Sequence, residues 1–378
     1  MITLTLEEKF KPPNIRYNRR MTIESLELTN FRSYEQKRFK LHPAVTLVVG
    51  PNASGKTNLL ESLYVLASTK SFRAKDCDLI RHEQDFFRIV AATDETQFAF
   101  SYSTAGGTQE KRVTHDDVRQ TLTGHVGQIQ VTLFEPTDLD LLAGPPEGRR
   151  KYLDFILCQT DRGYLKTLQA YRRVLKQRNA LLDGTGDGSL REEMFAWDVK
   201  FAELALEIYF RRSRLVEQIN ASLPLLYADI AGSPVEIELE YLPSVPGTHY
   251  GEVFLDTLVR NLPRDQAAGF TTIGPHREDF KVRFAGGDIM AIASRGETRT
   301  AVLACKLAEL EYAEAATGVR PVLLLDDVFS ELDRDRRTYL LGRLDGYQTI
   351  ITTTDADAIT REISTPHNII STTPKVKS

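Results

Sequence analysis

One short loop, Gly50 to Thr57, constrains the fold of this chain more than any other part of its sequence. It follows the apolar run at 44–49, which predicts a buried strand, and it precedes "TNLLESLYVLA", which predicts a helix. In this setting the free N–H groups of a glycine-rich loop can surround phosphate oxygens, and the positive end of the helix favours the negative charge. A plain glycine-rich turn is the competing interpretation. The pattern Gly-x4-Gly-Lys-[Ser/Thr] predicts a nucleotide-binding P-loop made of Gly50, Pro51, Asn52, Ala53, Ser54, Gly55, Lys56 and Thr57.

In such a loop Lys56 would bridge the β- and γ-phosphates, and the Thr57 hydroxyl would hold Mg²⁺. The matching half of the site is the apolar run at 322–325, which leads into Asp326 and Asp327. An acid at the end of a buried strand beside a phosphate loop typically holds Mg²⁺, which predicts Asp326 as a metal ligand. A strand that runs into a turn would explain the same residues without a metal. Neighbouring side chains on a strand point to opposite faces, so the two acids are expected in different environments.

Lys56 and Asp326 are 270 residues apart, much farther than the same motifs in small GTPases or simple kinases. The gap holds predicted strands and two long helices, which resembles ABC-type ATPases of the SMC and Rad50 kind. We expect an α/β fold: an ABC-type P-loop ATPase head with a mixed sheet plus an antiparallel β lobe, an inserted helical lobe II and no long coiled coil. The expected segments are a disordered or over-extended N-terminus at 1–20 before Met21, the head at 21–144 and 266–378, and the helical insertion at 145–265.

The helical insertion is also the most basic part of the chain. Its net charge between residues 145 and 185 is +5, whereas the whole chain carries −4. Such a cluster can neutralise nucleic-acid phosphates, or it can be an ordinary solvated helix face. The candidate DNA contacts are Arg149, Arg150, Arg172, Arg173 and Lys176, with further basic residues at 211–214. Apolar residues at helical spacing predict a hairpin of two helices around a turn at 183–189; they are Leu165, Leu168, Tyr171, Leu175 and Leu182, then Trp197, Phe201, Leu204, Ile208, Leu215 and Ile219.

A third motif, Ser294-Arg295-Gly296-Glu297, precedes a strong helical pattern. It fits the capping box Ser-x-x-Glu, in which the serine and the glutamate each bind a free backbone N–H of the helix start. In ABC-type ATPases the same position carries a signature that meets the γ-phosphate held by the other subunit. The two interpretations are compatible, because a helix start with free N–H groups is itself an anion site. The second interpretation predicts that two nucleotides are sandwiched between two heads.

The chain is similar to the RecF family of bacterial DNA replication and repair proteins over about residues 21–360. The phosphate loop alone is generic, but the combination of "YRRVLKQRNALL", "GPHRED" and "SRGE" is highly specific. The segments that carry the resemblance are, in order, "NFRSY", "GPNASGKT", "KSFR", "LIR", "GPPEGRRKYLD", "YRRVLKQRNALL", "GPHREDF", "SRGETRT" and "LLLDDVFSELD".

The resemblance implies a protein that binds ATP with Mg²⁺, dimerises on ATP and binds gapped DNA at single-strand/double-strand junctions. It also implies work with RecR and RecO to help RecA load, and weak, DNA-stimulated ATP hydrolysis that releases the DNA. By position, Asp326 corresponds to the metal-binding acid, Asp327 to the catalytic base and Asp333 to the loop that closes across the dimer. Arg32 would reach the nucleotide, and Arg73 would lie near phosphate or DNA.

Four positions depart from the common ABC pattern. Glu297 stands where many ABC proteins have glutamine, and Asp327 stands where most have glutamate. Aspartate is one methylene shorter, which is consistent with slow turnover because its reach to water needs tighter geometry. "TIITTTDAD" has no switch histidine, for which Thr353 or Thr354 is the expected substitute, and "TLFEPTD" occupies the region of the Q-loop without a glutamine.

Other P-loop classes fit this sequence less well. A transporter ATPase subunit lacks a long basic helical insertion, and a nuclease-linked Rad50-like ATPase needs a long coiled coil with a Cys-x-x-Cys hook. A P-loop kinase is disfavoured by the motif spacing and by the helix after "SRGE". Cys77, Cys158 and Cys305 form neither a metal pair nor a disulfide framework, which predicts a reducing cytoplasm. No apolar run approaches the ~18 residues that a membrane span requires, so no membrane partner is expected.

Overall fold

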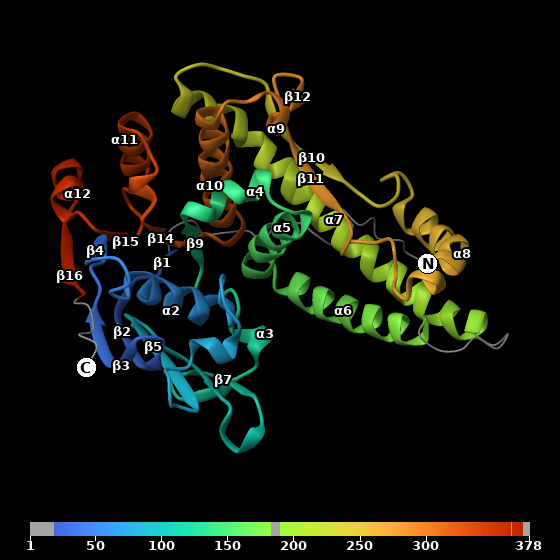
Figure 1. The fold of residues 1–378 in the computed structure, drawn as a ribbon, viewed down its shortest axis with the longest axis horizontal. Helices are drawn as coiled ribbons and strands as arrows, with labels where there is room; N and C mark the ends of the chain where they lie inside the picture. Colours follow the sequence, from blue (N-terminus) through green and yellow to red (C-terminus); the bar gives the residue numbers. More distant parts are fainter. Residues whose placement is uncertain (1–18, 183–189, 364, 373–378) are drawn as a thin grey trace. The chain divides into compact units, whose positions relative to one another are not determined.

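The computed structural model describes residues 19–182, 190–363 and 365–372, which fall into two compact units (Figure 1). Unit 1 is formed by residues up to 136 and from 309 onward, and unit 2 by residues 137–308. Most of the expected N-terminal extension and the expected turn at 183–189 lie outside the described residues. Arg19 and Arg20, expected within the extension, instead form the short strand β1, which pairs with β13.

Besides the two-stranded pair β1-β13, unit 1 contains two larger sheets that both contact one helix. Helix α2 contacts β9, β14 and β15 of a five-stranded sheet and β2, β5 and β6 of a six-stranded sheet. Its leucines are buried on several sides, as expected for a helix covered all round. In chain order the elements are β1 (Arg19–Arg20), β2 (Ile23–Phe31), β3 (Tyr34–Lys40), β4 (Val45–Val49), α2 (Lys56–Ser68), η1 (Asp76–Leu79), β5 (Phe86–Thr93), β6 (Gln97–Ser103), η2 (Ala105–Gly107), β7 (Glu110–His115), β8 (Val118–Gln120), α3 (Leu122–His125), β9 (Val131–Phe134), β13 (Val319–Arg320), β14 (Val322–Asp326), η4 (Val328–Ser330), α11 (Arg334–Arg343), β15 (Thr349–Thr353), α12 (Ala356–Glu362) and β16 (His367–Ser371).

The five-stranded sheet has the order β16-β4-β15-β14-β9, and all of its neighbouring strands are parallel. Its central strands are continuous apolar runs because both faces of a parallel sheet are covered. The six-stranded sheet, of order β3-β2-β5-β6-β7-β8, is antiparallel throughout. Since β4, β14 and β15 are parallel neighbours, the segments that follow them leave the sheet at the same edge. This edge is where the predicted site residues of unit 1 lie.

Unit 2 is helical, with one small antiparallel sheet of order β10-β11-β12. Helices α6 and α7 contact each other, which confirms the predicted hairpin of two helices. Because β11 pairs with β10, unit 2 extends to residue 308, beyond the expected end of the insertion at 265. Its elements are η3 (Pro136–Leu139) at the boundary, α4 (Asp140–Ala143), α5 (Pro146–Thr160), α6 (Arg162–Leu182), α7 (Leu190–Ala231), β10 (Ile237–Leu242), α8 (Tyr250–Ala268), β11 (Asp279–Phe284), β12 (Gly287–Asp288), α9 (Ile289–Ile292) and α10 (Arg295–Thr317), the last of which continues into unit 1.

The first predicted helix of the insertion breaks in two at Asp161. The Asp161 carboxylate accepts hydrogen bonds from the N–H groups of Gly163 (2.8 Å) and Tyr164 (3.1 Å), so α6 starts anew after α5. The buried face of α6 runs through Tyr164, Leu168 and Tyr171, whereas the predicted Leu165 and Leu175 are only half-buried. Helix α8 was not predicted, although Phe254, Leu258 and Leu262 recur at helical spacing.

Arg178 is the largest departure from the sequence-based expectation in unit 2. It was counted in the basic cluster, yet its side chain is completely buried. Its Nε donates to Asp198 (2.8 Å), and its Nη1 donates to Asp265 (2.7 Å) and to the Thr271 hydroxyl (2.7 Å). A buried guanidinium is tolerated only when such partners surround it. Arg178 therefore joins α6, α7 and the end of α8 instead of facing solvent.

Replacing Asp265 with asparagine should reveal how much this buried pairing contributes. The D265N variant keeps the shape, and Asp198 still balances the charge of Arg178. The variant loses the charge-assisted hydrogen bond from Arg178 to the Asp265 carboxylate, so its free energy of unfolding should fall by about 1–3 kcal/mol. Denaturant titration measures this change. The matched control is K200Q, which removes the exposed Lys200–Glu203 pair of α7 and should cost under about 0.5 kcal/mol. Equal stability of D265N and K200Q would contradict the prediction.

Candidate nucleotide-binding site

The phosphate loop joins β4 to α2 and is held against the last described strand. The Thr372 N–H donates to the Val49 carbonyl (2.8 Å), and the hydroxyls of Ser54 and Thr372 lie 2.6 Å apart. A Cβ atom on Gly50 would overlap Thr372, so only glycine fits at this position. Gly55 has a φ of 102°, and a Cβ there would lie 2.9 Å from the Ser33 hydroxyl. Both glycines of the motif are therefore required by the backbone.

Lys56, the first residue of α2, folds back over the loop. Its Nζ donates to the carbonyl oxygens of Gly50 (2.7 Å) and Pro51 (3.0 Å), and the residue is 8% exposed. The Tyr34 hydroxyl donates to the Gly55 carbonyl (3.0 Å), and burial raises the pKa of Tyr34 to about 12. The loop, its lysine and the start of α2 thus form one hydrogen-bonded unit in which the ammonium lies above the backbone of the loop.

The structure brings Thr57 and Asp326 together, as the two motifs predict. The Thr57 hydroxyl donates to Asp326 Oδ1 (2.9 Å), although the residues are 269 positions apart. A hydroxyl and a carboxylate oxygen are the hard ligands that Mg²⁺ prefers, and Mg²⁺ usually takes its remaining ligands from phosphates and water. Among the described residues, no cluster of three or more acidic, histidine or cysteine side chains could hold a metal ion by itself. These two side chains fit a magnesium ion bound together with a nucleotide.

Asp327 lies in a different environment from Asp326, for a reason other than strand alternation. Strand β14 ends at Asp326, and Asp327 adopts the left-handed conformation with a φ of 50°. Asp326 is buried and Asp327 is half-buried. Burial raises the pKa of Asp327, with Asp326 and Glu331 adding to this effect, while the nearby Lys56 opposes it. The two adjacent carboxylates are separated by a tight turn at the end of the strand.

Thr352 is a site residue that the sequence did not reveal. Its hydroxyl donates to Asp326 Oδ1 (2.7 Å) and accepts from the Asp327 N–H (2.9 Å), so it orients both acids. Thr352 belongs to β15 and lies opposite Asp326 in the parallel register. Only strand order shows this, because nothing in "TIITTT" distinguishes one threonine from the next.

Arg32 and Arg73 share one buried partner on the P-loop helix. Arg32 binds Glu61 through Nε (2.9 Å) and Nη2 (2.8 Å), and Arg73 binds the same carboxylate (2.8 Å). Burial by itself would raise the pKa of Glu61, but the hydrogen bonds from Arg32, Arg73 and Ser71 bring it below its ordinary value. Both arginines thus tie flanking segments to α2, and their expected contacts with nucleotide or DNA remain predictions.

The segment at Ser294 forms the predicted capping box. The Ser294 N–H donates to Glu297 Oε2 (2.7 Å), and the Glu297 N–H donates to the Ser294 hydroxyl (3.3 Å). At the start of α10, Ser294 is exposed and Glu297 is half-buried. Ser294 belongs to unit 2, whereas the phosphate loop belongs to unit 1. Asp333 caps α11 by accepting from the Arg336 N–H (3.0 Å), which lowers the pKa of its carboxyl.

The two candidates for the switch position differ in exposure. Thr353 is buried; its hydroxyl binds the backbone of Asp355 (3.1 Å), and its carbonyl accepts from the Gly50 N–H (3.3 Å). Thr354, the next residue, is exposed and follows the strand beside the phosphate loop. In the Q-loop region, Glu135 directly follows β9, whose last residue pairs with Leu325 of β14.

The structure sorts the predicted DNA-contacting residues into two groups. Arg149 is mostly buried and binds Asp279 through two hydrogen bonds (2.7 and 2.8 Å), so it joins α5 to β11 instead of facing solvent. Arg172 is exposed but lies 3.4 Å from Asp154. Arg173 and Lys176 are exposed and have no ion pair within the part of the chain that the structure describes. Arg211 and Arg212 of the "RRSR" segment are buried and paired with acids.

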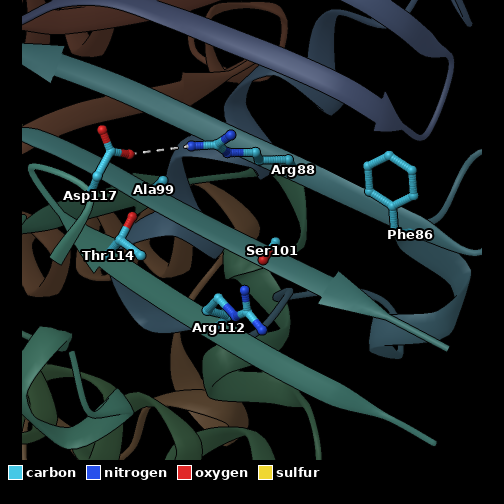
Figure 2. A pocket seen from close by; sticks show the side chains of 7 residues that line it. All are labelled: Phe86, Arg88, Ala99, Ser101, Arg112, Thr114 and Asp117. Carbon is cyan, nitrogen blue, oxygen red and sulfur yellow. Dashed lines mark ion pairs between the residues drawn. The ribbon is translucent and has the colours of Figure 1, made fainter. Parts of the chain in front are cut away.

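Unit 1 also has a pocket on the face of the antiparallel sheet, shown in Figure 2. Ser101 of β6 lies between Arg88 of β5 and Arg112 of β7, and the small side chains of Ala99 and Thr114 lie beside them toward Asp117. Arg88 is 3.9 Å from Asp117, and Arg112 is 3.4 Å from Glu110. None of the predicted nucleotide-binding residues lines this pocket, and its charges are balanced locally.

Together, the phosphate loop, the acid at the end of β14 and the parallel sheet beside an antiparallel one define a P-loop ATPase head of the ABC type. Residues 22–377 match the model of the RecF/RecN/SMC N-terminal domain. The DNA replication and repair protein RecF of Staphylococcus epidermidis is 36% identical over 357 residues, which cover 91% of this chain and 96% of that protein. The chain belongs to the RecF family.

Solved structures agree with this assignment. A structure of the recombination mediator protein RecF with ATP, in the RecFOR pathway, is 31% identical with a TM-score of 0.82, covering 91% of this chain and 94% of that chain. An Smc head bound to the C-winged helix domain of ScpA is 17% identical with a TM-score of 0.52, covering 93% of this chain and 93% of that chain, which shows the shared fold alone.

Within the described part of the chain, no helix is both long and apolar enough to span a membrane.

Replacing Thr352 with valine should destabilise the site edge of the sheet. The T352V variant keeps the side-chain shape but removes the hydrogen bonds to Asp326 and to the Asp327 N–H, which should cost about 1–3 kcal/mol of unfolding free energy. The matched control is T349V in the same strand, because the buried Thr349 hydroxyl has no partner among the described residues and its loss should be neutral or stabilising. Equal losses in both variants, measured by denaturant titration, would argue against this role for Thr352.

Proposed function

We propose that this protein is an ATP-dependent DNA-binding clamp of recombinational repair and replication. The observation that carries the proposal is the hydrogen bond between Thr57 and Asp326 beside a complete phosphate loop. The similarity to RecF proteins, including one solved with ATP, supports ATP as the nucleotide and DNA repair as the setting. In this proposal the clamp closes by dimerisation on ATP, and slow hydrolysis opens it.

Each residue of the nucleotide site has a physical role in this mechanism. The loop N–H groups and Lys56 bind the triphosphate oxygens, which replace the loop carbonyls as partners of the ammonium. Thr57 and Asp326 would hold Mg²⁺, which supplies neutralisation of the phosphate charge. Asp327 orients the attacking water and accepts its proton, and its raised pKa suits a general base. Thr352 holds the carboxylate of Asp326 and the backbone N–H of Asp327, which fixes the position of each acid for its separate task.

The signature residues would act on the nucleotide of the second subunit. Ser294, Arg295, Gly296 and Glu297 form an exposed, capped helix start, and the N–H groups of such a start attract phosphate. Asp333 caps a helix just after the two acids and would close the loop across the dimer. Each site would then be complete only when a second copy arrives, which links ATP binding to dimerisation.

The proposed polymer ligand is gapped DNA at a single-strand/double-strand junction. Arg173 and Lys176 are exposed on α6, where they can neutralise backbone phosphates without reading bases. The similarity to a RecF protein of the RecFOR pathway supports RecO and RecR as partners and RecA loading as the outcome. DNA stimulation of the weak ATPase would follow if DNA favours the closed dimer.

Sedimentation with ATP, with ADP and without nucleotide tests the clamp. The wild type should dimerise only with ATP, and gapped DNA should co-sediment with the dimer. The S294R variant should bind ATP as a monomer but fail to dimerise, because a bulky cation would stand where the second subunit's phosphate must approach. A wild type that stays monomeric under every condition, with and without DNA, would refute the proposal.

Two substitutions separate nucleotide binding from hydrolysis. K56A should lose ATP binding, because the ammonium that faces the phosphates is gone. D327N should bind ATP and dimerise but hydrolyse it at least about 100-fold more slowly, since an amide cannot accept the proton. Nucleotide binding and phosphate release are measured on both variants. Normal hydrolysis by D327N would show that Asp327 is not the base.

A further inference from the structure

Two arginines on neighbouring segments of unit 2, Arg150 of α5 and Arg277, have no acidic partner among the described residues. Arg149, Arg172, Arg178, Arg211 and Arg212 each lie within 4.0 Å of a carboxylate. Among the described residues, no carboxylate lies that close to Arg150 or Arg277. Arg277 belongs to the "GPHRED" segment, whose role the nucleotide site does not explain.

The segment that carries Arg277 is held rigidly by buried polar groups. Arg212 donates to the Pro275 carbonyl (2.7 Å), and the Tyr171 hydroxyl lies 2.6 Å from His276 Nδ1. The Glu278 carboxylate accepts from the hydroxyls of Tyr241 (2.5 Å) and Tyr250 (2.6 Å). Every residue around Arg277 is thus fixed to the helices or to β10, while Arg277 itself is exposed.

Arg150 reaches the same segment from α5. Its Nη1 donates to the carbonyl of Glu278 (2.9 Å), the residue that directly follows Arg277. Arg277 in turn stacks over Phe270, with its Cζ 4.7 Å from the ring centroid, and this ring is 42% exposed. Burial lowers the pKa of Arg150, and the charges of Arg212 and Arg277 lower it further, although Asp279 and Glu147 act in the opposite direction. The Arg150 guanidinium thus contacts the backbone directly after Arg277, and Arg277 covers part of an exposed aromatic ring.

We propose that Arg150, Arg277 and Phe270 form a contact site for the single-stranded part of the DNA. Unpaired guanidiniums favour backbone phosphates, which release their counterions on binding. An exposed aromatic ring beside an arginine offers a stacking surface for an unpaired base, and a base in a duplex cannot use it. The carboxylates of an acidic protein segment would bind the guanidiniums but would not stack on the ring. This inference rests on the proposed DNA-binding function, and it places the single-stranded part of the junction at these three residues.

Binding of labelled DNA to full-length R277Q and F270A, with ATP and over a series of salt concentrations, tests this site. R277Q should weaken binding to gapped DNA and reduce the slope of log Kobs against log salt by about 0.7, the share of one phosphate contact on a single strand. R277K keeps the charge and should retain the slope. F270A should lose about 5-fold to 100-fold in affinity for gapped DNA and remain unchanged on blunt duplex. The control is R283Q, which removes the same charge from an arginine paired with Glu240 and should bind as wild type.

The outcomes separate this inference from the proposed function. A wild type that does not bind gapped DNA with ATP would refute the DNA-binding function itself. A wild type that binds, together with an R277Q variant of unchanged affinity and slope, would overturn the site alone. Loss of poly-glutamate binding by R277Q with DNA binding intact would assign the site to an acidic protein instead. ATP-dependent dimerisation and an unchanged unfolding transition in R277Q show that its fold is intact, and a double R150Q/R277Q variant should reduce the slope by about 1.4.

Discussion

The hydrogen bond between Thr57 and Asp326 is the interaction on which the nucleotide site depends. It joins residues 269 positions apart and can form only if β4, β15 and β14 are parallel neighbours that end at the same edge. Thr352 of the middle strand completes the arrangement, because its hydroxyl binds both acids. The chemistry of the site therefore requires this strand order. The long insertion between the two motifs does not change the order of these strands.

Buried charges organise both units in the same way. Glu61 binds two arginines at the P-loop helix, and in unit 2 Arg178 and Arg212 are surrounded by acids and hydroxyls. Burying such groups is costly unless every partner is in place, so each network tolerates few alternative packings. Segments such as "GPHRED" that looked like functional motifs are in large part the partners of these networks. The exposed residues of these segments, such as Arg277, take no part in the buried networks and are accessible to a ligand.

This division explains why counting charges overstated the exposed basic surface of unit 2. The sequence contains nine basic side chains between residues 145 and 185, and their number alone predicts a basic surface. The structure turns Arg178 inward because this side of α6 packs against α7 and α8, and it pairs Arg149 of α5 with Asp279 of β11. Arg277, which lies outside the counted cluster, is exposed and has no ion pair among the described residues. A helix in isolation does not show which of its charged faces is covered.

The sequence by itself determined the phosphate loop, the acid that ends the strand beside it, the capping box at Ser294 and the class of the fold. Each of these depends on residues close together in the chain, where a strand, a turn and a helix start follow local rules. Only the tertiary structure decided the roles of Thr352, Glu61 and Arg178, since each acts through partners that are distant in the sequence. It also decided where α6 begins and that residues 266–308 belong with the helices, because β11 finds its hydrogen-bonding partner in β10.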